Sequence, residues 1–156
     1  MLERNILGCC NLFITTTIQN KENKMAIIAN ASVQTKPEHW LGEVTSGKHT
    51  LLTDKPESFG GKDQGLAPYD FICSGLIACT MITLRMYAEH KGLDLGEFRV
   101  EADFNANKEG KEWIERRVSF SNDLSDELKQ KVLAICQKTP VTKTLLRSVE
   151  INTQLV

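Results

Sequence analysis

The feature that most constrains the fold is an apolar run in the middle of the chain. Residues 71–84 form a stretch of 14 residues without a charged side chain. This is short of the roughly 18 residues that a bilayer span requires, so the run predicts a buried core helix. Pro68 suits the first turn of a helix and Gly92 suits its end. We therefore expect one long helix over residues 68–91.

The middle of this helix is apolar on all sides, so every side of it needs to be covered. A chain of 156 residues is long enough for one domain and short for two. We therefore expect a single domain over residues 25–156, preceded by a flexible N-terminal extension over residues 1–24. The remaining cover for the helix is expected from a second copy, which predicts an obligate homodimer with this helix at or near the interface.

The segments before the long helix have the pattern of short strands. Residues 27–34 alternate between apolar and polar side chains, which predicts a strand with one buried face. Further strands are expected around residues 40–45 and 49–53, with residues 46–48 as the turn between them. Glycine, proline and charged residues gather in residues 54–67, which predicts an exposed loop. The first third of the domain is therefore expected to be an antiparallel meander.

The segments after the long helix predict a hairpin, two helices and a final strand. Alternating residues over about 98–104 and 112–121 favour the hairpin. Ser125 is a typical helix cap before an apolar stripe that ends at Cys136, and Thr139-Pro140 is a cap with a first-turn proline for a helix to about residue 147. Residues 149–155 alternate again, which predicts a closing strand. The whole pattern indicates an α+β fold with antiparallel sheets.

Arg116 is a charged residue that falls among the apolar, inward-facing positions of the second hairpin strand. Its neighbours on the same face are Ile114, Val118 and Phe120. One interpretation is a rim arginine whose stem packs while its head reaches water. The other is a guanidinium that points into a functional site.

Charge and cysteine usage exclude several classes of function. The chain carries 19 basic and 20 acidic residues, so no basic excess exists to neutralise a nucleic acid backbone. Its five cysteines are odd in number and form no CxxC pair, which favours a cytoplasmic location. The three histidines share no metal-ligand spacing, and phosphate-binding and dinucleotide motifs are missing from the sequence. We expect no metal, no bound cofactor, no nucleic acid partner and no membrane.

Thiol chemistry is the remaining candidate. Cys79 lies near the middle of the long helix and Cys136 on the later apolar stripe. Either residue could be an inert small hydrophobe, because buried cysteines usually are. A reactive thiol needs a neighbouring cation that lowers its pKa. Arg116, Lys62 or a residue of a partner subunit could supply that cation, and the sequence does not choose among them.

Two motifs carry a resemblance to a known family. Residues 60–71 hold a glycine pair followed by a Pro-Tyr-Asp helix start, and residues 75–80 hold an Ala-Cys pair. Residues 139–145 read TPVTKTL, similar to a second signature that usually begins Cys-Pro-Val-Ser. In these motifs and in the order of its elements over roughly residues 26–156, the chain resembles the OsmC/Ohr family.

The resemblance implies both a fold and an activity. The fold is an intertwined homodimer in which long buried helices lie centrally between curved antiparallel sheets, with two active sites at the interface. Family peroxidases reduce organic or lipid hydroperoxides with a thiolate, which becomes sulfenic acid and condenses with a resolving cysteine. Cys79 matches the peroxidatic position. A dithiol, often a protein-bound lipoyl group, then regenerates the enzyme.

The chain departs from the family pattern at the resolving cysteine. Thr139 occupies that position, and Cys136 lies three residues upstream. Residues three apart in a helix lie on similar sides of one turn. Cys136 is therefore the candidate resolving thiol, and a disulfide between Cys79 and Cys136 is one candidate for the oxidised form.

The chain also departs from the pattern in its charged residues. The family's acid falls at Tyr69, and Asp70 stands next to it. Asp70 is a candidate for that catalytic role, although an acid in the first turn also complements the helix dipole. The family's arginine falls near Trp40 or Leu41, where no arginine occurs.

These observations support three functional hypotheses. The main one is a thiol-dependent reductase of organic hydroperoxides that uses Cys79, with Cys136 as resolving thiol. The second is a non-catalytic dimeric module that binds a small apolar ligand at the subunit interface. The third is a thiol redox sensor or thiol-transfer protein, which would oxidise at Cys79 without turnover.

Overall fold

The computed structural model describes residues 26–155. They divide into two compact units, residues 26–72 and residues 73–155, and each is described by itself. The predicted extension over residues 1–24 lies outside the described residues. The assignment of residues 25–156 to one domain stays a prediction.

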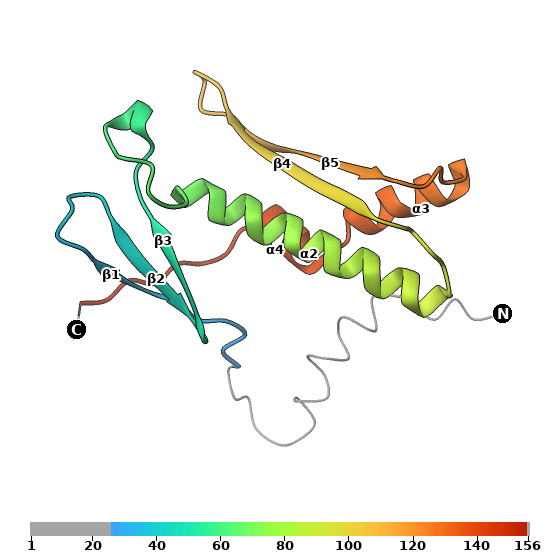
Figure 1. The fold of residues 1–156 in the computed structure, drawn as a ribbon, viewed down its shortest axis with the longest axis horizontal. Helices are drawn as coiled ribbons and strands as arrows, with labels where there is room; N and C mark the ends of the chain where they lie inside the picture. The colour runs from blue at the N-terminus through green and yellow to red at the C-terminus, as the bar shows by residue number, and fades with distance from the viewer. Residues whose placement is uncertain (1–25, 156) are drawn as a thin grey trace. The chain divides into compact units, whose positions relative to one another are not determined.

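The first unit is built on a three-stranded antiparallel sheet (Figure 1). Its strands are β1 (Ser32–Thr35), β2 (Gly42–Ser46) and β3 (His49–Thr53), and they pair in sequence order. A short 3-10 helix, η1 (Glu57–Phe59), follows in the loop. The predicted antiparallel meander is confirmed.

The prediction that the first strand begins at residue 27 is wrong. Pairing between β1 and β2 starts with Ser32 opposite Thr45, and β2 ends one residue later, at Ser46. Residues 27–30 therefore extend beyond the end of β2 and have no residue of that strand to pair with. Ile27 is accordingly exposed, at 82%.

Helix α2 (Pro68–Lys91) has the predicted bounds. Gly92 ends it in a left-handed conformation with φ of 63°. The side chains that it buries lie along one stripe of the helix: Leu76, Thr80, Leu84, Tyr87 and Ala88. By length and composition alone α2 could cross a membrane, since its most apolar 18-residue window has a mean hydropathy of 1.5, yet only 28% of that window is buried. We expected this helix to be covered on every side. Within the described chain only one side of it is covered.

Strands β4 (Phe98–Ala106) and β5 (Glu112–Phe120) form the predicted hairpin. The register places Val100 opposite Val118 and Ala102 opposite Arg116. Arg116 therefore lies on the face that carries the apolar residues of both strands, as the alternation predicted.

Two capped helices complete the second unit. Helix α3 (Asp126–Cys136) begins after Ser125, whose hydroxyl accepts a hydrogen bond from the Leu128 N–H. Helix α4 (Pro140–Arg147) begins after Thr139, whose hydroxyl accepts one from the Thr142 N–H. Both caps were predicted from the sequence.

The predicted closing strand over residues 149–155 is not formed. Within the described chain these residues belong to no strand, and Ile151 is 83% exposed. Alternation alone does not make a strand, because a strand also needs a neighbour that accepts its backbone hydrogen bonds.

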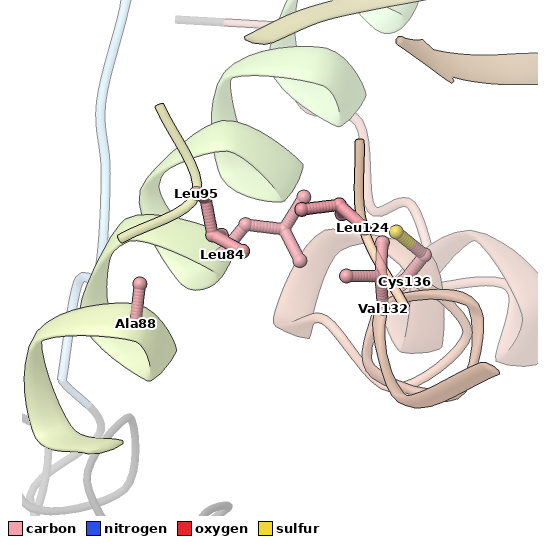
Figure 2. Packing of buried hydrophobic residues seen from close by; sticks show 6 residues of the cluster. All are labelled: Leu84, Ala88, Leu95, Leu124, Val132 and Cys136. Carbon is pink, nitrogen blue, oxygen red and sulfur yellow. The ribbon is translucent and has the colours of Figure 1, made fainter. Parts of the chain in front are cut away.

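The core of the second unit joins α2, the hairpin and α3. Figure 2 shows Leu84 of α2 reaching toward Leu124, with Val132 and Cys136 beyond it. Half-buried residues of the hairpin, including Phe98, pack against this cluster. The cluster fixes the helix that carries Cys79 relative to the helix that ends in Cys136.

Candidate active site

Arg116 connects the two motifs that carry the family resemblance. Its Nη1 donates one hydrogen bond to Oγ1 of Thr80, at 3.0 Å, and another to Oγ1 of Thr142, at 2.9 Å. Thr80 follows Cys79 in α2, and Thr142 lies in the first turn of α4. The structure therefore shows a guanidinium that is hydrogen-bonded within the protein, and its part in a functional site stays a prediction.

The first turn of α4 holds the arginine through a chain of hydroxyl groups. The hydroxyl groups of Thr139 and Thr142 lie 2.7 Å apart, and that of Thr142 also donates to the Cys136 carbonyl at 3.2 Å. Thr139 is fully buried, so the position of the family's resolving cysteine is a structural cap in this chain. Helices α3 and α4 are thereby tied to the arginine.

Cys136 is buried beside this network. Its side chain belongs to the hydrophobic core cluster and is 4% exposed. Burial raises the pKa of its thiol, while the positive charge of Arg116 opposes that rise. Cys136 is therefore mainly a protonated thiol near neutral pH.

Cys79 is half-buried and lies on the flank of the buried stripe of α2. It precedes Thr80 by one residue, which is a rotation of about 100° around the helix. Cys79 and Cys136 form no disulfide with each other in this structure. The pairing of Cys79 with Cys136 stays a prediction about the oxidised protein.

Asp70 supports the start of α2. Its Oδ2 accepts a hydrogen bond from the Ala67 N–H at 2.9 Å, which is the bond of a helix-start acid. Nine residues separate it from Cys79, or about 13.5 Å along the helix axis. The structure thus gives Asp70 a capping bond, and its catalytic role stays a prediction.

A cavity of about 870 Å³ opens beside Arg116 in the second unit. Cys136 and Thr142 also line it, whereas Cys79 is not among its lining residues. Most of its wall is apolar and comes from β5, α3 and α4. The cavity is large enough for a small organic molecule, because ligand pockets commonly measure roughly 300–1,000 Å³.

The first unit organises the glycine-rich motif around one acid. Asp54 is 5% exposed and accepts hydrogen bonds from the backbone N–H groups of Lys55, Lys62 and Gln64. These bonds, that of Gln64 most of all, lower the pKa of its carboxyl group. The loop needs glycine at position 61, because a Cβ there would lie 1.6 Å from the Lys55 carbonyl oxygen.

A cation does occur near the position where the family's arginine falls. The Lys55 ammonium group lies 4.3 Å from the centre of the Trp40 ring, and the His39 ring meets the same ring edge-on. The sequence pattern did not reveal this pair, because the two residues lie 15 positions apart on either side of a hairpin. Lys62, a predicted candidate cation, belongs to this unit and contacts Asp54 through its backbone.

The roles of Thr80 and Thr142 were also missed from the sequence. Threonine in a helix usually donates to the carbonyl one turn earlier, and Thr80 does so to Leu76. Nothing in that local pattern indicates a second bond to a strand 36 residues away. In the described part of the chain, no three His, Cys, Asp or Glu side chains gather in the manner of metal ligands.

Comparisons with known proteins agree on one family. Residues 61–154 match the family model described as OsmC-like protein. No curated protein matches the chain.

Solved structures show a shared fold at low sequence identity. One from Psychrobacter arcticus, provisionally described as an osmotic stress induced and detoxification response protein, has 15% identity and a TM-score of 0.66 over 78% of this chain and 90% of that one. An OsmC-like protein from Mycoplasma pneumoniae has 16% identity and a TM-score of 0.61 over 78% of this chain and 89% of that one. An organic hydroperoxide resistance protein from Legionella pneumophila has 17% identity and a TM-score of 0.60 over 78% of this chain and 91% of that one.

Proposed function

Because the chain belongs to the OsmC-like protein family, we propose that it is a cysteine-based organic hydroperoxide reductase with Cys79 as its nucleophile. The observation that carries the proposal is the bridge made by Arg116. This guanidinium bonds Thr80, the residue after Cys79, and Thr142, in the second motif. The two motifs therefore share one cation in the folded chain.

The reaction consumes one hydroperoxide and two electrons. The Cys79 thiolate attacks the O–O bond, forming a sulfenic acid while the alkoxide leaves and takes a proton to become an alcohol. A second thiol attacks the sulfenic sulfur, which forms a disulfide and releases water. A dithiol, such as a lipoyl group on a protein partner, reduces the disulfide and is itself oxidised.

Cys136 is the proposed second thiol. It packs in the same cluster as Leu84, which lies five residues beyond Cys79 on α2. The raised pKa and the burial of Cys136 both disfavour attack, because the thiolate is the nucleophile and must reach the sulfenic sulfur. Disulfide formation is therefore expected to be slower than the first oxidation.

A second copy and a reducing compartment belong to the proposal. Ile82 on α2 is 52% exposed and Met81 is 41% exposed, so this face of the helix has apolar surface to bury. A homodimer formed through α2 would cover it. The cytoplasm would keep the thiols reduced and supply the dithiol donor.

One observation favours a second candidate function. The cavity beside Arg116 has a mostly apolar lining that includes Cys136, and Cys79 is outside it. A ligand could therefore bind there without contact with the proposed nucleophile. This arrangement suits a non-catalytic binding module in which the cysteines serve as packing. No feature of the described residues favours the redox-sensor hypothesis over the other two.

Peptide mapping by mass spectrometry tests the main proposal. Reduced protein receives one equivalent of cumene hydroperoxide and is compared with the variants Cys79→Ser, Cys136→Ser and Cys73→Ser. Cys73 is the matched control, because it is also half-buried and lies on the same helix. We expect a Cys79–Cys136 disulfide in the wild type and in Cys73→Ser, and a trapped sulfenic acid at Cys79 in Cys136→Ser.

The same experiment separates the alternatives. If the Cys79 thiol stays unmodified, the reductase proposal is contradicted and the non-catalytic binding module is the remaining candidate function. Oxidation at Cys79 without repeated turnover, when dihydrolipoamide is supplied as the dithiol, would favour the redox sensor.

A further inference from the structure

The inner face of the β4–β5 hairpin is apolar at most of its positions. Residues directly opposite each other in an antiparallel pair lie on the same face of the sheet. Arg116 and Glu112 are the charged residues on this face, and of the two only Arg116 is half-buried, because Glu112 is exposed at the first position of β5. The face comprises Phe98, Val100, Ala102, Phe104 and Ala106 on β4, and Glu112, Ile114, Arg116, Val118 and Phe120 on β5.

The protein leaves the charge of Arg116 unbalanced. Both of its hydrogen bonds run from Nη1 to neutral hydroxyl groups, and within the described residues no carboxylate pairs with it. No hydrogen bond to Nε or Nη2 is found among those residues, and no buried side-chain nitrogen there lacks a partner, so these two groups are accessible. Arg116 also lines the cavity. A half-buried guanidinium with free donors is suited to an anion with two oxygens in one plane.

The rest of the cavity is suited to an alkyl chain. Its volume is about 870 Å³, and its apolar wall comes from side chains on three elements, among them Ile114, Val132 and Leu145. Apolar surface of this kind gains free energy when it is removed from water.

The acids that also line the cavity, Glu112, Glu115 and Asp123, are exposed residues. Glu115 accepts a hydrogen bond from Trp113 Nε1, and Asp123 pairs with Lys129 at 3.5 Å. Glu112 is exposed at the start of β5. The positive charge of Arg116 is therefore the inner charge of the cavity, and the negative charges face solvent.

We propose that this cavity is a binding site for an alkyl carboxylate, whose carboxylate pairs with Arg116 and whose chain lies along the apolar wall. The site does not depend on the proposed peroxide chemistry, because Cys79 is not a lining residue. Its ligand carries no peroxide group and is not consumed.

Calorimetric titration of the full-length protein with decanoate tests the site, at concentrations below micelle formation. The matched probe is 1-decanol, which has the same chain without the charge. We expect decanoate to bind at least tenfold more tightly than decanol, because the carboxylate forms charge-assisted hydrogen bonds with the guanidinium. Equal affinity of the two probes would overturn the proposal, and this comparison needs no variant.

Variants at two neighbouring arginines test whether Arg116 is the positive charge that binds the carboxylate. Arg116→Met should lose at least tenfold in decanoate affinity and keep its decanol affinity. Arg117→Met is the matched control, because Arg117 lies on the opposite face of β5 and pairs with Asp103 at 2.6 Å. An equal loss in both variants would show a general charge effect and contradict the proposal.

Alkylation of Cys136 gives a second readout. Cys136 lines the cavity, so bound decanoate should slow its reaction with N-ethylmaleimide, and decanoate should leave Cys79 unaffected. Absence of decanoate binding together with an inert Cys136 would mean that a second copy fills the cavity, which overturns the proposal. Because the titration and the alkylation can both be made on Cys79→Ser, failure of the reductase proposal leaves this test intact.

Discussion

At the scale of the residue, Arg116 determines what the site can do. A charge on an apolar sheet face is costly unless it is solvated or bonded, and two threonine hydroxyl groups supply the bonds here. Strand alternation placed this residue on the inner face. It did not show that Thr80 and Thr142 would meet it, because they come from helices 36 and 26 residues away.

The contribution of this bond can be measured with a matched pair of threonines. Thr80 and Thr83 each donate to the carbonyl four residues earlier in α2, but only Thr80 also accepts from Arg116. Thr80→Val should therefore lower the free energy of unfolding by about 1–3 kcal/mol, as expected for a lost bond to a charged group. Thr83→Val should lower the free energy of unfolding by clearly less. Urea unfolding measures both, and equal losses would contradict the role given to Arg116.

Asp54 predicts a pH dependence in the first unit. Its pKa is below the ordinary value of 3.8 in the folded loop, chiefly through the backbone bond from Gln64. Its stabilisation is therefore complete above that ordinary value and is lost as the pH falls through the lower folded pKa. Amide exchange protection at Lys62 and Gln64 should fall over this acidic range. In Asp54→Asn the protection should already be low at neutral pH and nearly independent of pH.

At the scale of the element, local signals predicted the helices and the hairpin well. Ser125 and Thr139 mark helix starts through capping bonds made within a few residues, and Pro68 does so through its fixed backbone angle and its missing N–H. All three helix starts hold in the structure. The strands were predicted less well. The first strand begins at Ser32 because β2, its partner, is too short to pair with earlier residues.

The glycine-rich loop depends on a close approach of two backbone segments. A Cβ at position 61 would lie 1.6 Å from the Lys55 carbonyl oxygen, whereas a Cβ at position 75 would meet no described atom within 4 Å. Gly61→Ala should lower the free energy of unfolding by about 1–3 kcal/mol and expose the Lys62 and Gln64 amides to exchange. The control Gly75→Ala should leave those amides protected. Unchanged protection in Gly61→Ala would mean that the loop does not hold this conformation.

At the scale of the whole molecule, the exposed surface of α2 is the feature on which the proposed assembly rests. The helix buries one stripe within the chain and leaves apolar side chains outside it. The proposed dimer would cover them, since a second copy presents the same surface in a symmetric contact.

Oligomeric state tests this assembly. Ile82 on α2 is 52% exposed and Leu133 on α3 is 56% exposed, so the two are matched in exposure. Ile82→Glu should convert the dimer to a monomer, because a buried unpaired carboxylate is costly at an interface. Leu133→Glu should leave the dimer intact. Analytical ultracentrifugation distinguishes these outcomes, and a wild-type monomer would contradict the proposed assembly.

The sequence by itself determined the elements whose signals are local and the family to which they belong. Caps, turns and alternation act over a few residues, so helix α2, the β4–β5 hairpin and the two motifs could be found without coordinates. Only the tertiary structure decided that Arg116 bridges those motifs and that Cys136 is buried beside it. It also decided that residues 149–155 stay outside any strand. These outcomes depend on which distant segments come into contact, and no periodicity in a single segment carries that information.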